Sequence, residues 1–363
     1  MLHIVLIFSI FYLIFFIFLK ILAYIKNNYY LCPEFANLTL QIQYTNMKKV
    51  LLLAVMAIAL MACGGPNGSG NPANIEGSLP GKFVLPSGKV ICFSMGNLQY
   101  NAAQDVWRFA PRQYGVVGAG GNGNIAGADG SGKSDNALVS EDYDGWIDLF
   151  GHGTSGWPSG AEAYQPWTIN DESKYYIPLD IRESDPLPEN YDLTDDYANA
   201  DWGVYNKISN GGNEAGIWRT LAREEWRWLT EDRPNAEDLI GKATIQGARG
   251  MVLMPDDWQQ PEEIEWESGY GQDWDTNEYS YDEWKVLEDA GAVFLPCAGV
   301  RTSSGGDVEV EDINSGGFYW SSSSFLGGGF LCAYDLYFNS FIHEMYTYDM
   351  RCFGESVRLV REL

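Results

Sequence analysis

The sequence has few Cys and His residues, and those present do not form a pattern typical of a transition-metal site or of a catalytic nucleophile. It contains six Cys and three His. No Cys-x-x-Cys motif occurs, and neither His152 nor His343 has another His or Cys close by in the sequence. These absences argue against a zinc site and against a Cys-His or Ser-His-Asp catalytic set. We therefore expect no metal, no cofactor and no catalytic residues, with His152 a packed polar side chain.

Basic charge is also scarce. The chain has 23 Lys and Arg against 49 Asp and Glu, for a formal net charge of −26. Such a surface repels nucleic acid and anionic membrane, so we expect no nucleic-acid partner. The acidic runs lack the spacing of an EF-hand and are typical of solvated surface. A hydrolase whose two carboxylates pair only in space stays open as an alternative, because sequence does not show that pairing.

Two nucleotide-binding patterns occur without the context that gives them function. Residues 127–134 match Gly-x-x-x-x-Gly-Lys-Ser, and residues 118–123 match Gly-x-Gly-x-x-Gly. A phosphate site needs a buried strand before the loop and a helix after it. The first match follows a glycine-rich segment, and the residues after it lack the apolar spacing of an amphipathic helix. The second match follows a weak strand pattern and does not begin a helix. Residues 118–136 are therefore predicted to form a long loop.

The start of the chain carries a hydrophobic export pattern. At Met47 two lysines precede an apolar run that ends in Leu-Met-Ala-Cys63, which is typical of a secretory signal and resembles a bacterial lipobox. The resemblance implies a signal peptide over 47–62 and a lipid such as palmitate on Cys63. The expected location is the outer membrane, on its periplasmic or cell-surface face, with the lipid anchor as the membrane contact. Residues 1–46 are interpreted as a start-site artefact, with an N-terminal hydrophobic segment as the alternative.

After this signal we expect a tether and one domain. Residues 63–81 are rich in Gly, Asn, Pro and Ser without apolar periodicity, which predicts a flexible tether. Without residues 1–62, which hold four Lys and one Glu, the net charge becomes −29. Residues 82–363 predict a single α+β domain in which aromatic side chains supply much of the core. A hairpin is expected over 82–100 and a second strand pair over 106–117.

Two helices are expected in the middle of the domain. Residues 220–232 have Thr220 as a candidate cap and acidic residues in the first turn. Residues 280–291 have Ser280 as a cap, Trp284 and Leu287 on one face, and Gly291 as the end. The chain after 292 returns to strand patterns.

The segment between the last two predicted strands has an unusual composition. A connection between strands is normally built from Gly, Pro, Asn, Asp and Ser. Residues 341–353 are instead rich in Phe, Tyr, Met and Cys. These side chains form either a display surface or part of the core. Cys332 and Cys352 flank the segment and could pair in an exported protein, although free buried thiols are the usual outcome for this residue type.

Several segments together resemble a known family. "FSMGNLQYNAAQDVWRFAPRQY", "GWIDLFGHGTSGW", "WRTLAREEWRWL", "VFLPCAGVR" and "RCFGESVRLV" follow in order. Over residues 82–363 this is similar to the Fibrobacter succinogenes major paralogous domain (FISUMP-like) lipoproteins of Bacteroides-type bacteria, and in part to sulfatase-modifying-factor domains. The resemblance implies a C-type lectin-like α+β domain with two helices and a small antiparallel C-terminal sheet. The sequence around Cys332 and Cys352 does not match the catalytic cysteine pair, and the calcium-lectin motifs are absent.

The resemblance also suggests a role for the aromatic segment. Some lectin-fold proteins of this kind are targets of diversity-generating retroelements, in which framework residues stay constant while outward positions vary. The expected framework is Trp320, Leu336, Phe338, Arg351, Gly354, Val357 and Arg358. The expected ligand-binding display positions are Phe325, Leu326, Phe330, Asp335, Phe341, His343, Tyr346, Tyr348, Asp349 and Phe353.

We therefore expect a lipid-anchored recognition protein for an unknown protein or glycan ligand. An enzyme on the same fold, either an oxidase or a hydrolase, and a structural cell-surface lipoprotein are the alternatives.

Overall fold

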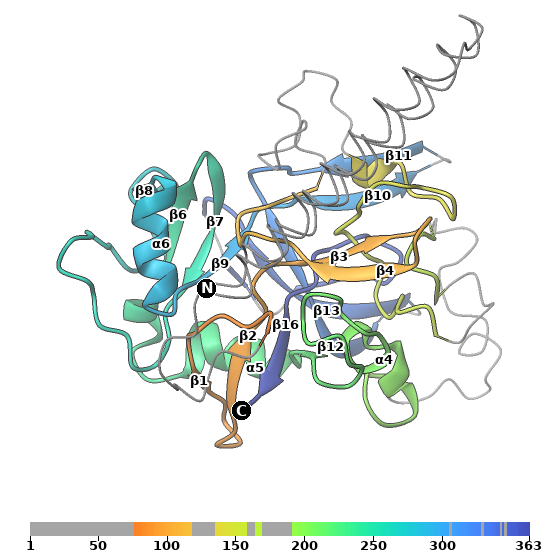
Figure 1. The fold of residues 1–363 in the computed structure, drawn as a ribbon, viewed down its shortest axis with the longest axis horizontal. Helices are drawn as coiled ribbons and strands as arrows, with labels where there is room; N and C mark the ends of the chain where they lie inside the picture. The colour runs from red at the N-terminus through yellow and green to blue at the C-terminus, as the bar shows by residue number, and fades with distance from the viewer. Residues whose placement is uncertain are drawn as a thin grey trace, which may run out of the picture. The chain divides into compact units, whose positions relative to one another are not determined.

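The computed structural model describes residues 76–117, 135–157, 164–168, 191–304, 307–327, 330–341, 343–344 and 347–363. These residues all belong to one compact unit, Pro72–Leu363. The unit is mixed and strand-rich, with few helices and several small antiparallel sheets (Figure 1). The expected mixed class is confirmed at this level.

One four-stranded sheet joins the beginning and the end of the described chain. Its order is β1 (Phe83–Val84), β2 (Val90–Phe93), β16 (Leu359–Glu362) and β5 (Arg219–Thr220). β1 and β2 form the expected hairpin around the Pro-Ser-Gly turn. Leu79 is buried, and its backbone N–H donates to the Phe93 carbonyl at 2.9 Å, so the packed domain begins before the predicted end of the tether.

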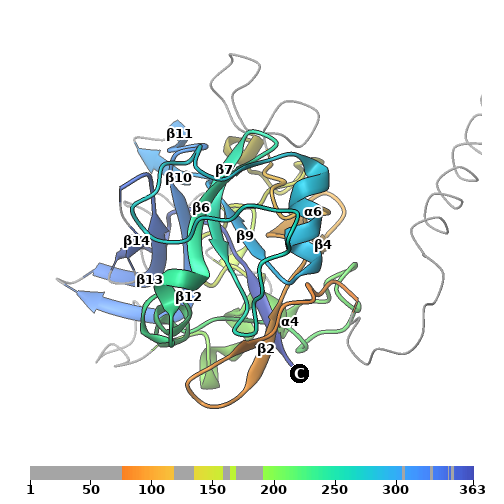
Figure 2. The ribbon, with the colours of Figure 1, turned by 90° about the vertical axis from the view of Figure 1, so that its left-hand side faces the viewer.

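A second sheet carries the longest helix. It has the order β8 (Glu278–Tyr279), β6 (Ile240–Ile245), β7 (Ala248–Leu253) and β9 (Val293–Pro296). Helix α6 (Tyr281–Asp289) lies beside this sheet in both ribbon views (Figures 1 and 2).

The predicted ends and buried face of α6 are confirmed. Ser280 Oγ accepts a hydrogen bond from the Glu283 N–H, and Gly291 has a φ of +102° just after the helix. Trp284 and Leu287 are buried against the sheet residues of one core cluster.

The other predicted helix starts later than expected. α5 (Arg223–Arg227) continues into a π-helical turn (Trp228–Asp232). Thr220 lies in strand β5 and does not cap the helix. The Glu225 carboxylate instead accepts a hydrogen bond from the Ala222 N–H at 2.9 Å. It thereby satisfies a backbone donor at the start of the helix, as a capping side chain would. Trp226 is fully buried and is the buried side chain of α5.

Short elements fill the space between the sheets. β3 (Leu98–Asn101) pairs with β4 (Val106–Phe109). The expected strand pair within 106–117 is therefore wrong, because only its first four residues are a strand and their partner precedes them. The remaining short helices are α4 (Trp202–Tyr205) and the 3₁₀ turns Asp135–Ala137, Asp195–Ala200 and Ala236–Leu239.

The C-terminal strands form the sheet that carries the predicted site. β12 (Gly317–Gly327) and β13 (Phe330–Phe338) form a long antiparallel hairpin. The other edge of β13 pairs with β14 (His343–Glu344) and β15 (Tyr348–Met350). A separate hairpin, β10 (Val300–Ser304) with β11 (Asp307–Glu311), precedes it.

Strand β13 is covered on both faces. Leu336 and Phe338 belong to the core cluster that contains Trp226, whereas Ala333 belongs to a second cluster with Trp320. The framework residues predicted from the sequence are all buried: Trp320, Leu336, Phe338, Arg351, Gly354, Val357 and Arg358.

Several predictions lie outside the described residues. They concern the N-terminal segment 1–46, the signal peptide with Cys63, most of the tether and the glycine-rich patterns within 118–134. In the part of the chain that the structure describes, no helix is both long and apolar enough to cross a bilayer.

Candidate functional site

The predicted display positions do not all lie on one face of the C-terminal sheet. Alternation along the strand predicts that Asp335 faces outward with Tyr337, opposite to Tyr334 and Leu336. Asp335 is instead fully buried, at 0 % exposure, while Tyr334 is partly exposed. The outward orientation expected for Asp335 is therefore not seen, because β13 is an interior strand with core on both sides.

Three aromatic rings gather on the more exposed side. The ring centroids of Phe325 and Tyr348 lie 4.0 Å apart, and Tyr334 lies 5.2 Å from Phe325. Tyr334 and Tyr348 are direct cross-strand partners, which explains their contact. The Arg223 guanidinium lies 4.2 Å above the Tyr334 ring centroid. Tyr348 is 49 % exposed, so the group presents an aromatic and cationic face at the surface.

A fourth ring stands apart from this group. Phe341 is 87 % exposed in the turn after β13, where its backbone N–H donates to Asn339 Oδ1 at 2.7 Å. Together Phe325, Tyr334, Tyr348 and Phe341 are called the aromatic surface below. Phe353 and Asp349 are partly buried. Tyr346 and the side chains of Leu326, Phe330 and His343 lie outside what the structure describes.

Three acidic side chains converge behind the same strands. Asp335, Asp349 and Glu355 each place a carboxylate oxygen within 4.8 Å of the other two. Asp349 is the cross-strand partner of Ala333, so Asp335, two residues further along β13, is its diagonal neighbour on the same face. Glu355 arrives from the final segment, where its backbone exchanges hydrogen bonds with Phe150. We refer to Asp335, Asp349 and Glu355 as the carboxylate cluster.

The carboxylate cluster lies in a poorly solvated place. Asp335 and Glu355 are fully buried, and Asp349 is partly exposed. Among the described residues, neither oxygen of Glu355 accepts a hydrogen bond, and no basic side chain forms an ion pair with any of the three carboxylates. A hydrogen bond from Thr347 lowers the pKa of Asp335, but burial raises it by more. Burial raises the pKa of Asp335 and Glu355 well above the ordinary range, and the charge of Asp349 adds to the shift. Burial also raises the pKa of Asp349.

The cysteines are unsuited to nucleophilic chemistry. Cys92, Cys297, Cys332 and Cys352 are all buried and are not joined in disulfides, so Cys332 and Cys352 do not form the disulfide considered from the sequence. Burial raises the pKa of the Cys332 thiol to about 11, which disfavours the reactive thiolate.

His152 is a packed side chain, as expected from the sequence. Its Nε2 lies 2.9 Å from the Ser321 carbonyl, and its ring packs edge-on against Trp202 and Trp320. Burial and the nearby Arg351 charge lower its pKa well below the ordinary value. The imidazole is therefore neutral and enclosed.

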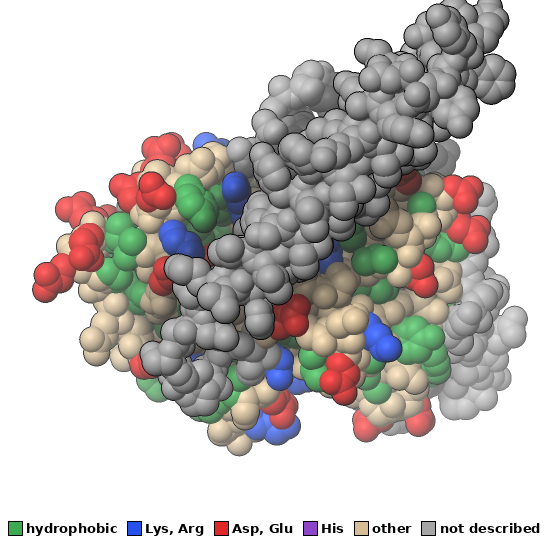
Figure 3. Space-filling view, viewed as in Figure 1, with side chains coloured by type: hydrophobic (Ala, Val, Ile, Leu, Met, Phe, Trp, Pro, Cys, Tyr) green, Lys and Arg blue, Asp and Glu red, His purple; other side chains and the backbone are tan. Residues whose placement is uncertain are grey.

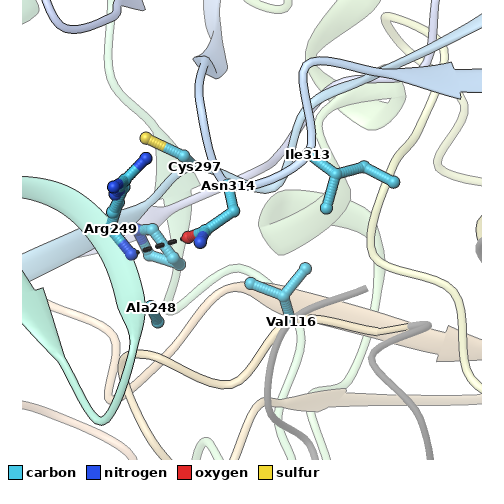
Figure 4. Close-up of a pocket in the computed structure, with 7 residues that line it drawn as sticks. Val116, Ala248, Arg249, Cys297, Ile313 and Asn314 are labelled. Carbon is cyan, nitrogen blue, oxygen red and sulfur yellow. Dashed lines mark hydrogen bonds between the residues drawn. The ribbon is translucent and has the colours of Figure 1, made fainter. Parts of the chain in front are cut away.

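Two hollows lie away from the carboxylate cluster. The first, shown in Figure 4, has a volume of about 10 Å³ and is lined in part by Val116, Cys297 and Asn314, with the Asn314 Oδ1 bound to the Arg249 N–H. Its volume fits about one water molecule. The second is a polar hollow of about 430 Å³ lined by Arg249 and residues 273–276. None of the three clustered carboxylates lines either hollow.

Acidic side chains dominate part of the visible surface. Figure 3 shows them gathered at the edge where Figure 1 places α6 and the segment after β7. Glu262, Glu263, Glu265 and Asp282 are among the exposed residues there. The expectation that most acidic runs are solvated surface agrees with this part of the chain.

Sequence reasoning missed one member of each group and the cation beside the aromatic surface. Tyr334 seemed to belong to the buried face, and Arg223 and Glu355 were not singled out. A quoted motif, "RCFGESVRLV", contains Glu355 among residues that are otherwise small, apolar or basic. An acidic residue within this otherwise uncharged or basic segment was the one available signal.

Comparison of the chain with protein-family models, with curated proteins and with solved structures gives no match.

Proposed function

We propose that this chain is an exported, lipid-anchored recognition protein that binds a protein or glycan ligand through the aromatic surface. The observation that carries the proposal is the exposure of Tyr348 on the C-terminal sheet and of Phe341 in the turn after β13, while the framework residues of that sheet are buried. Exposed aromatic residues of this size, set beside a cation at Arg223, are typical of interaction sites. The expected ligand would cover them.

Aromatic side chains suit this role energetically. Tyr and Phe bring a large contact area with only two side-chain torsions to fix, so little conformational entropy is lost on binding. Tyr348 is already held against Phe325, which pre-orders it further. Phe341 lies in a turn and would be the more adaptable contact. A glycan ligand would stack on the ring faces, and a protein ligand would bury them.

The fold and the export belong to the same proposal. The helices α5 and α6 and the small C-terminal sheet are features that a C-type lectin-like, FISUMP-type domain would have. Cys63, as the lipid-bearing residue, would anchor the domain to the outer membrane through the segment that precedes Leu79. Genetic diversification of the outward positions is the further part of the proposal that rests on the resemblance alone.

The binding role is tested with a glycan microarray and a displayed peptide library, both probed with the purified chain. We expect Tyr348→Ser and Phe341→Ser each to weaken binding to the retained members by at least about tenfold, since central aromatic contacts contribute on the order of 2 kcal/mol. Tyr281→Ser is the matched control, because Tyr281 is similarly exposed but lies on α6. Equal binding by all four proteins, or no retained member in either library, would refute the proposed role.

The anchor is tested separately by metabolic labelling with a palmitate analogue. The wild-type chain should incorporate the label and sediment with membranes, whereas Cys63→Ser should do neither. Label in the variant would exclude lipidation at this cysteine.

A further inference from the structure

We propose that the carboxylate cluster of Asp335, Asp349 and Glu355 is a binding site for a divalent, oxygen-preferring cation, with Ca²⁺ the best match. The three carboxylates converge within 4.8 Å, and Asp335 and Glu355 are fully buried. Both carboxylate oxygens of Glu355 lack a hydrogen-bond donor within the described chain. The site lies behind the aromatic surface and does not depend on what binds there.

Unpartnered buried carboxylates need compensation. Leaving an ionised carboxylate without water or a donor is very costly, so native proteins pair such groups, protonate them or give them a metal ion. No Lys or Arg forms an ion pair with the three groups in the part of the chain that is described. Two explanations remain: the three groups share protons, or a cation neutralises them.

The arrangement of the oxygens favours a cation. Oxygens bound to one ion lie on a sphere around it, so two ligands of Ca²⁺, at about 2.3–2.6 Å each, are at most about 5 Å apart. The separations in the carboxylate cluster fall within this limit without movement. Protons alone require only pairwise contacts and do not explain why three side chains from three segments meet at one point.

The ligand type selects the class of ion. Among the acidic, His and Cys side chains that the structure describes, the ones that converge here are all carboxylates, which suits hard cations such as Ca²⁺ and Mg²⁺ and disfavours Zn²⁺ or copper. Mg²⁺ needs strict octahedral geometry at about 2.0–2.1 Å, whereas Ca²⁺ accepts six to eight oxygens in looser geometry. Three carboxylates supply up to six oxygens. Asp349 is partly exposed and gives the ion and its remaining waters a route of entry.

Such an ion would also order the edge of the sheet. Asp349 follows Tyr348 in β15, and successive strand residues point to opposite faces. An ion held by Asp349 would therefore fix the strand that presents Tyr348 on the other side.

The test uses the whole chain stripped with a chelator at pH 7.5, with Ca²⁺ and Tb³⁺ as the probes. Ca²⁺ at about one hundred times its Kd should raise the Tm by at least about 3 °C. Bound Tb³⁺ should give luminescence on excitation of the nearby aromatic residues, and Ca²⁺ should displace it. Absence of both effects would overturn the proposal.

Variants decide whether the ion binds at this place. Glu355→Gln and Asp349→Asn should each weaken Ca²⁺ binding by at least tenfold, because each removes a charged ligand. Asp257→Asn, at an exposed position, should leave binding unchanged and controls for adventitious ions on the acidic surface. Unchanged affinity in both cluster variants would place the ion elsewhere and overturn the proposal. If Glu355→Gln does not fold, the partly exposed Asp349→Asn decides alone.

Discussion

Replacement of Glu355 by Gln should stabilise the protein when no cation is present. Glu355 is fully buried beside two other carboxylates and accepts no hydrogen bond within the described chain. Neutralising a buried charged group normally destabilises a protein, because the group loses a favourable ion pair or hydrogen bond. Glu355 has no such partner among the described residues. The substitution keeps the shape of the side chain, so the packing around it should be preserved.

The size of the effect follows from electrostatics. The carboxylate oxygens lie within 4.8 Å of one another, and two ionised groups at that separation repel each other by about 3–4 kcal/mol at an effective dielectric constant of about 20. The protein relieves this repulsion by holding protons, at a cost of about 1.4 kcal/mol per pH unit above the ordinary pKa, or up to about 4 kcal/mol near pH 7. Gln removes that cost and adds about 1–3 kcal/mol for a buried amide. We expect a net gain of about 1–3 kcal/mol.

The dependence on pH gives the sign of the effect. Because the pKa of Glu355 is raised in the folded state, the folded chain binds more protons than the unfolded chain above the ordinary pKa. The stability of the wild-type protein therefore falls as pH rises through this window, and the advantage of Glu355→Gln should shrink from pH 7.5 to pH 5. Buried Asp148 and Asp201, each with a pKa raised to about 6, act in the same direction in both proteins and cancel in the difference.

The assay is urea unfolding in chelator, followed by tryptophan fluorescence, at both pH values. A loss of more than about 1 kcal/mol for Glu355→Gln at pH 7.5 would refute the reasoning, since it would mean that the carboxylate has a favourable partner. With Ca²⁺ added, the order should reverse and the wild-type protein should be the more stable.

Three further changes test the fold by the same unfolding assay or by labelling. Glu225→Gln should cost about 1–2 kcal/mol, because Glu225 pairs with Arg219 at 2.6 and 2.8 Å and caps α5, whereas Glu224→Gln at the exposed neighbouring position should cost little. Gly291→Ala should cost at least about 2 kcal/mol, because φ is +102° and the new Cβ would lie 2.8 Å from the Gly81 Cα. Gly88→Ala should cost less, because Gly88 has a positive φ but open space around it. Equal losses of stability in the two variants would contradict a steric clash at Gly291. Thiol reagents should label the buried cysteines only after the protein unfolds, and a disulfide mapped between any two of them would contradict the structure. These cysteines are Cys92, Cys297, Cys332 and Cys352.

The features that the sequence predicted well depend on neighbouring residues. Helix α6 has its cap, its buried face and its end within a dozen residues, from Ser280 to Gly291. The β1–β2 hairpin is equally local. For α5 the local signal was ambiguous, because Thr220 and Glu225 could each satisfy the first turn, and pairing of β5 with β16 fixed Thr220 in a strand.

The site depends on contacts that a single sequence does not show. Alternation assigned Asp335 to the outside because the rule assumes one solvated face, whereas β13 contributes Ala333 to one core cluster and Leu336, on its other face, to another. Glu355 meets Asp335 only because the final segment crosses to Phe150 through an isolated bridge. Among 49 acidic residues, no spacing marks these three. Phe341 and Tyr348 were predicted as outward from the aromatic composition of 341–353 and from the family resemblance, and they are the exposed members.

The position of β16 has a consequence for biogenesis. This strand lies between β2 and β5, so the last strand of the described chain completes a sheet whose first members are more than 260 residues earlier. Every other described element leaves the ribosome before that sheet can close. If the chain is exported as proposed, this one sheet could be completed only after the final segment had crossed the membrane.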